Sequence, residues 1–193
     1  MVTIQSKFIG EFKTGDNIKH NLEILSLLYD QYAAEDDHNK RLLCKPIIVF
    51  LVSIIDAALY DLHTRIKEFT REGVENILAA SIEYIRNLKK LDDLGKCIDS
   101  AKQHNLLDQP PAFYVELDDL RRLRNRIHIQ NKHKHFEPNE YDAFNEERKN
   151  QAEIAVEKTL LKLAEKFARN HDYVGDFNLP WDAHVGDAKG KKQ

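Results

Sequence analysis

The chain has 193 residues and nearly balanced charges, with 29 Lys and Arg against 32 Asp and Glu and a formal net charge of −3 at pH 7. A chain of this length is expected to form one domain with a well-buried core. The net charge excludes a polycation that binds nucleic acid over its whole surface, so such an attraction must come from a local patch. Its two cysteines, Cys44 and Cys97, exclude a disulfide framework and fit a reducing cytosol.

No segment is expected to enter a membrane. The N-terminus lacks the basic and apolar pattern of a signal sequence. The longest apolar run, 47–58, is interrupted by Ser53 and Asp56 and is too short to span a bilayer, so we interpret it as part of a core helix. We therefore expect a cytoplasmic protein without a membrane partner.

The first third of the chain predicts an extended arm followed by two helices. Residues 1–15 alternate weakly between apolar and polar, which favours the arm. Asp16 or Asn17 is a suitable N-cap for a first helix. That helix carries apolar side chains at a 4-3-4-3 spacing, at Ile18, Leu22, Leu25, Tyr29 and Tyr32. A polar turn at 35–39 leads into a second helix that is apolar nearly all round, so we expect it to be the most buried element.

The rest of the chain predicts further helices and then a tail. Pro46 lies in the first turn of the second helix or kinks it, and Pro110-Pro111 is a firm break between later helices. The later helices are expected at 74–88, 94–101, 112–131 and 141–168. The predicted fold is an all-α, up-and-down bundle of five or six helices over residues 16–169. We expect residues 170–193, which contain three glycines and a proline, to form an irregular or loosely docked tail.

The segment 120–131 is the most distinctive part of the chain. It contains four arginines within six residues, and no Asp or Glu occurs from 121 to 135. If the segment is helical, successive side chains are roughly 100° apart around the axis. The helix then has one apolar stripe, which begins before this segment and is formed by Phe113, Leu117, Leu120, Leu123 and Ile127. Arg124 projects within this stripe, and Arg121 and His128 follow its edge. We therefore expect a set of polar side chains at the margin of the core, where an anion would stabilise them.

The neighbouring residues divide between this margin and the solvent. Asn125 lies slightly further round from the stripe, whereas Arg122 and Arg126 point in the opposite direction.

No glycine-rich phosphate loop and no Ser or Cys nucleophile motif is present. The three nearby histidines, His128, His133 and His135, lack the spacing and partners of a zinc site. We therefore expect neither a metal nor a cofactor.

The Arg124-Asn125 dipeptide followed by His128, within an all-α chain that ends in a long helix, resembles the HEPN superfamily (higher eukaryotes and prokaryotes nucleotide-binding). The signature of that family is an Arg and a His separated by four to six residues, with a polar residue after the Arg. Three residues separate Arg124 from His128, whereas Arg121 and Arg122 fall within the family's spacing but lack the Asn. Helical direction favours Arg124 and His128 as the functional pair, with Arg121 and Asn125 assisting.

The resemblance implies a metal-independent endoribonuclease, of a toxin or phage-defence type, that cleaves single-stranded RNA. A histidine can transfer a proton near neutral pH, and an arginine can hold two phosphate oxygens at once. The resemblance also implies a homodimer with a composite active site and an antitoxin partner such as a small nucleotidyltransferase. His133, together with Lys132 and Lys134, is expected to contact RNA phosphates from a basic loop.

Asp56 is a second candidate site residue, because every direction on its helix is expected to be buried. A buried carboxylate needs a partner, and Arg124 or Arg121 would meet this need and be oriented by it. A local hydroxyl, that of Ser53 or Tyr60, is the alternative partner. The alternative function is a non-catalytic helical module that binds RNA, a nucleotide or a protein partner through the same basic patch.

Overall fold

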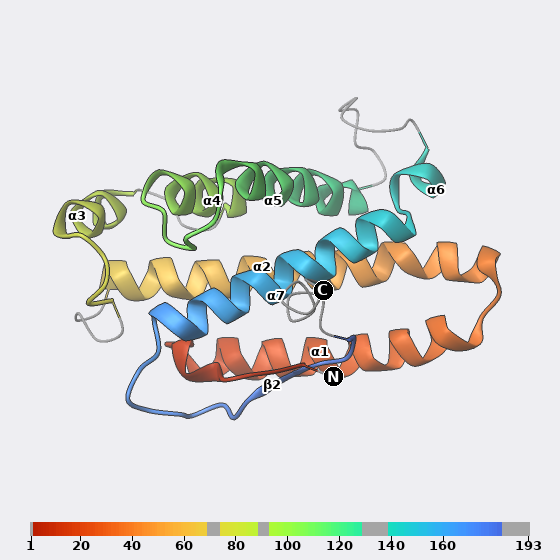
Figure 1. Ribbon diagram of the computed structural model, residues 1–193, viewed down its shortest axis with the longest axis horizontal. Helices are drawn as coiled ribbons and strands as arrows, with labels where there is room; N and C mark the ends of the chain where they lie inside the picture. Colours follow the sequence, from red (N-terminus) through yellow and green to blue (C-terminus); the bar gives the residue numbers. More distant parts are fainter. Residues whose placement is uncertain (1, 69–73, 89–92, 129–138, 183–193) are drawn as a thin grey trace, which may run out of the picture.

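The computed structural model describes residues 2–68, 74–88, 93–128 and 139–182 as an all-α single domain with one small sheet (Figure 1). Within these residues there are seven α-helices, α1 (Phe12–Ala34), α2 (Asp37–Glu68), α3 (Ala79–Asn87), α4 (Leu94–Gln103), α5 (Pro111–Arg124), α6 (Glu140–Ala143) and α7 (Glu146–Lys166). The remaining elements are strands β1 (Val2–Ile4) and β2 (Phe177–Leu179) and the 3-10 turns η1 (Ser6–Phe8) and η2 (Asn125–Ile127). The predicted all-α class is confirmed, with more helices than the five or six expected.

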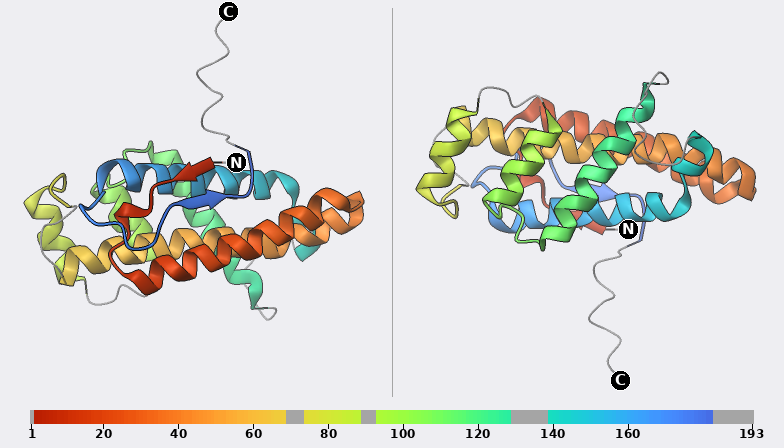
Figure 2. Two further views of the ribbon diagram at one scale, coloured as in Figure 1. Left: turned by 90° about the horizontal axis from the view of Figure 1, so that it is seen from below. Right: turned by 90° about the horizontal axis from the view of Figure 1, so that it is seen from above.

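Helix α2 is the centre of the fold. It packs against α1 and α7 and also against α3, α4 and α5. Figure 1 shows α1 on one side of α2 and the pair α4 and α5 on the other, and Figure 2 shows α4 beside α5 from above. The side chains that face these neighbours are buried, among them Ile47, Ile48, Leu51, Val52, Ile54 and Ile55. The expectation that the second helix is the most buried element therefore agrees with its position.

By length and composition, α2 is the one helix in the described parts of the chain that could cross a bilayer. Half (50%) of the most apolar 18-residue stretch of α2 is nevertheless buried inside the fold, which is compatible with the core helix of a soluble protein. Pro46 lies in the interior of α2 and not in its first turn, because the helix already begins at Asp37. The missing N–H of Pro46 therefore removes one hydrogen bond from the helix interior.

The beginnings of two helices, α1 and α3, differ from the expected ones. Helix α1 begins at Phe12, before the expected cap at Asp16, because the distant Asp61 carboxylate accepts from the N–H groups of Gly10 (2.7 Å) and Glu11 (3.0 Å). Helix α3 begins only at Ala79, although the expected helix began at residue 74.

The expected last helix is two helices. The Asn145 side chain caps α7 by accepting from the backbone N–H of Arg148 (2.9 Å), so α6 and α7 are separate. The structure describes the expected tail as far as residue 182, and this part of it docks on the domain. Strand β2 pairs antiparallel with β1, with Thr3 opposite Asn178. Trp181 is buried as well, with its ring 5.8 Å from that of Tyr29, so the tail docks on α1.

Candidate functional site

Helix α5 presents the predicted apolar stripe to the core. Pro110 and Pro111 open the helix, as the predicted break requires, because proline fits the first helical positions. The stripe side chains within the helix are all buried, namely Phe113, Leu117, Leu120 and Leu123. This burial places the residues at the C-terminal end of α5 against the neighbouring helices α2 and α4.

The helix ends earlier than predicted, which changes the position of His128. Helix α5 ends at Arg124, and a 3-10 turn, η2, follows at Asn125–Ile127. His128 then has extended backbone angles (φ −75°, ψ 98°) and an exposed side chain. Ile127, expected within the buried stripe, is 42% exposed. The prediction that Arg121, Arg124 and His128 share one helical face is therefore wrong, because their common helix does not continue past Arg124.

Arg124 is joined to Asp56, as the sequence predicted for an arginine and this carboxylate. Its Nη2 lies 2.5 Å from Asp56 Oδ2, and the bond links the last residue of α5 to the middle of α2. Both side chains are largely shielded, with exposed fractions of 22% for Arg124 and 33% for Asp56. The Nε of Arg124 is buried and has no hydrogen-bond partner among the described residues. The guanidinium is therefore oriented from one side and retains a free donor.

Arg121 is oriented by a different acid, Asp118, one turn earlier on α5. Its Nε and Nη2 lie 2.8 Å and 2.7 Å from Asp118 Oδ1. The other carboxylate oxygen of Asp118 binds the exposed Arg122 at 2.7 Å. Gly95 lies against Arg121, because a Cβ at this glycine would be 3.3 Å from Arg121 Nε. A larger residue at position 95 would therefore displace the guanidinium.

These side chains share one polar cleft between α2, α4 and α5. The cleft has a volume of about 460 Å³ and is lined by Asp56, Asp93, Leu94, Lys96, Arg121, Arg124 and Asn125. The cleft therefore brings together four of the predicted site residues, namely Asp56, Arg121, Arg124 and Asn125. His128, the predicted proton-transfer residue, is not part of its lining.

Two charged residues of the cleft were not identified from the sequence. Asp93 is the N-cap of α4, where its side chain accepts from the backbone N–H of Gly95 (2.9 Å), and Lys96 follows in the first turn. The sequence marks Asp93 as the residue before a helix but contains no signal that this helix begins beside the end of α5. Lys96 adds a third cation to the cleft, and Asp93 adds a second carboxylate.

The pKa of Asp56 is raised above its ordinary value. Burial is the largest cause, and the nearby negative charge of Asp93 acts in the same direction. The charge and the hydrogen bond of Arg124 oppose this effect and lower the pKa. Asp56 is thus paired with one cation, Arg124. An anion that enters the cleft would meet this carboxylate as well as the arginines.

The other predicted RNA-binding residues, Lys132, His133 and Lys134, lie outside the described residues. Among the residues that the structure does describe, no group of three or more His, Cys, Asp or Glu side chains could hold a metal ion. Comparison with protein-family models, with curated proteins and with solved structures gives no match for this chain.

Proposed function

We propose that this protein is a metal-independent endoribonuclease that cleaves single-stranded RNA, as its resemblance to the HEPN superfamily implies. The observation that carries the proposal is the convergence of Arg121, Arg124 and Asn125 in one cleft. Guanidinium and amide groups are donors that suit the non-bridging oxygens of a phosphodiester. Asp118 and Asp56 hold the two guanidiniums in place before RNA binds, so less side-chain entropy is lost on binding.

In the proposed reaction, the RNA 2′-hydroxyl loses its proton to a base, and its oxygen bonds to phosphorus. The bond between phosphorus and the 5′ oxygen breaks, and that oxygen takes up a proton. The products are a 2′,3′-cyclic phosphate and a 5′-hydroxyl. Arg124 and Arg121 stabilise the additional negative charge on the pentacoordinate phosphate, and His128 transfers a proton.

The exposed position of His128 supports a site built by two chains. One chain provides a single histidine in this motif, whereas the reaction removes one proton and adds another. We propose a homodimer in which the two α5 helices face each other and bring two His128 residues to one composite site. Sedimentation should then give a dimer at micromolar concentration, and a monomer at every concentration would contradict this arrangement.

The proposed setting is the cytoplasm of a cell that uses the enzyme as a toxin or phage-defence effector. An antitoxin such as a small nucleotidyltransferase is then the expected partner. These assignments of place and partner rest on the resemblance to the HEPN superfamily alone.

A second candidate function is a non-catalytic module that binds RNA, a nucleotide or a protein partner. One observation favours it: His128 does not line the cleft. A module of this kind needs the cations of the cleft but has no use for a proton-transfer group.

Incubation of the purified protein with single-stranded RNA in EDTA separates the two functions. For the enzyme, cleavage disappears in Arg124→Ala and in His128→Ala but persists in Arg122→Ala and His20→Ala, which change exposed residues outside the cleft. For the module, RNA binds without being cleaved, salt weakens the binding, and Arg124→Ala abolishes it. Cleavage that is unchanged in both Arg124→Ala and His128→Ala would falsify the proposed site.

A further inference from the structure

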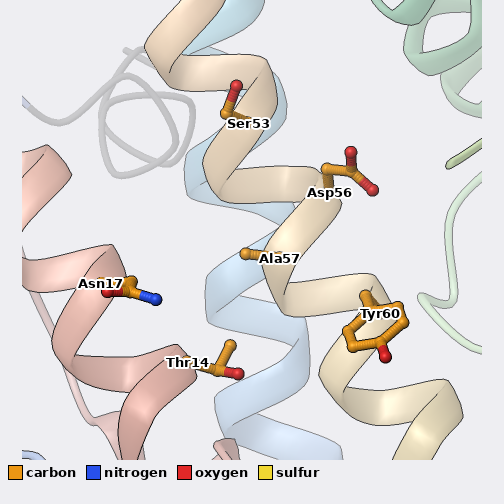
Figure 3. A pocket seen from close by; sticks show the side chains of 6 residues that line it. All are labelled: Thr14, Asn17, Ser53, Asp56, Ala57 and Tyr60. Atoms are coloured by element: carbon orange, nitrogen blue, oxygen red, sulfur yellow. The ribbon is translucent and has the colours of Figure 1, made fainter. Parts of the chain in front are cut away.

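A second hollow lies on the other side of Asp56, between α1 and α2, and has a volume of about 320 Å³ (Figure 3). Helix α1 contributes Thr14 and Asn17 to its lining, and α2 contributes Ser53, Asp56, Ala57 and Tyr60. On α2 these residues follow a spacing of three or four, so they occupy one face of the helix. Because Asp56 lines both the cleft and this hollow, the two spaces adjoin each other.

The hollow combines an aromatic ring with unengaged polar groups. Tyr60 is 39% exposed, and no partner of its hydroxyl or of its ring occurs among the described residues. The same is true of the Asn17 side-chain amide, since only its backbone carbonyl accepts a hydrogen bond, from Asn21. Ser53 donates to the carbonyl of Val49 at 2.8 Å, which leaves its oxygen free to accept. A flat ligand with hydrogen-bonding edges matches this combination.

The small side chain of Ala57 completes this surface. It lies between Ser53 and Tyr60 on the same face of α2, and Figure 3 shows it on the side of α2 that is turned toward Asn17 and Thr14. A larger side chain at this position would extend toward α1 and narrow the hollow.

We propose that this hollow is a subsite for a nucleobase of the RNA chain whose phosphate occupies the arginine cleft. The base stacks on Tyr60, and its polar edge meets Asn17 and Ser53. Stacking on an aromatic side chain accepts any base, because every base has a π face, so Tyr60 contributes affinity with little sequence preference. This inference rests on the proposed function, because it takes the ligand of the arginine cleft to be RNA.

The test measures binding of a short single-stranded oligonucleotide that carries 2′-O-methyl groups, so that it cannot be cleaved. A second oligonucleotide has the same backbone but no bases. Tyr60→Leu should weaken binding of the first roughly tenfold and leave binding of the second unchanged. Tyr60→Phe should bind both as the wild type does, because the stacking face remains. Tyr84→Leu is the control, since Tyr84 has a similar exposed fraction, 42%, and lies on α3, outside the hollow.

Three results would overturn the subsite. They are an equal loss of affinity for both oligonucleotides in Tyr60→Leu, no loss for either one, and no binding by the wild type.

Cleavage of unmodified RNA is measured separately, so the two proposals can fail independently. If RNA is cleaved and Tyr60→Leu binds normally, the subsite is wrong and the enzyme remains. If binding depends on the bases but RNA is not cleaved, the subsite remains and the catalytic function is wrong.

Discussion

Asp56, in the middle of the central helix, and Arg124, the last residue of α5, are 68 residues apart in sequence and are joined by a contact of 2.5 Å. This contact ties the end of the arginine-rich helix to the core of the fold. It also fixes the direction of the guanidinium that the proposed function requires. The two roles, one in stability and one in function, can be measured separately.

The stability role predicts coupling between the two residues. Asp56→Ala should lower the free energy of unfolding by about 1–2 kcal/mol, because the shielded guanidinium loses its partner. In a double-mutant cycle with Arg124→Ala, measured by urea unfolding, the coupling should be about 1 kcal/mol. The pair Arg122 and Asp118, in which the arginine is 42% exposed, is the comparison and should couple more weakly. Additive effects of the Asp56 and Arg124 substitutions would show that the contact contributes nothing.

Buried His63 predicts a loss of stability in mild acid. Burial lowers its pKa from 6.5 to about 4, and the charge of His104 adds to this effect, whereas the hydrogen bond of its Nδ1 to the Leu59 carbonyl opposes it. The neutral form is thus favoured in the folded state. The stabilisation is complete above pH 6.5 and is lost as the pH falls toward 4, by up to about 1.4 kcal/mol per pH unit.

The measurement is urea unfolding of the wild type and of His63→Asn across this pH range. The wild type should lose stability more steeply with falling pH than His63→Asn does, because only the wild type takes up this proton on unfolding. His20→Asn changes an exposed histidine and should keep the wild-type slope. Equal slopes in all three proteins would contradict the low pKa of His63.

The docked tail predicts a buried tryptophan signal. Trp181 is the only tryptophan in the chain and is 6% exposed, so the folded protein should emit at shorter wavelength than the unfolded protein. Phe177→Ala removes a buried ring from β2 that lies 5.9 Å from the ring of Phe8, and it should cost about 3–5 kcal/mol and shift the emission to longer wavelength. Tyr173→Ala, at an exposed position before β2, should leave the spectrum unchanged. Emission typical of indole in water from the folded wild type would contradict the docking.

The sequence predicts those parts of the site that depend on periodicity or on the cost of a buried charge. The stripe from Phe113 to Leu123 follows from its spacing. The pairing of Asp56 with Arg124 follows because a carboxylate on a helix buried all round needs a cation. These two arguments also place Arg121 and Asn125 at the same margin.

Other features depend on contacts that helical spacing does not encode. The end of α5 at Arg124, and with it the exposure of His128, does not follow from a hydrophobic pattern that continues through Ile127. Asp93 and Lys96 reach the cleft only because α4 packs beside α5. The strands β1 and β2 have three residues each, which is too short for a recognisable alternation, and they pair across nearly the whole chain.

The central claim is that Arg124 and His128 act together on an RNA phosphodiester, and end-group analysis of RNA incubated with the protein in EDTA tests it most directly. The wild type is predicted to produce fragments with a 2′,3′-cyclic phosphate and a 5′-hydroxyl. Arg124→Ala and His128→Ala, each folded as judged by circular dichroism, are predicted to leave the RNA intact. RNA that stays intact with the wild type, or the same fragments from both variants, would contradict the claim.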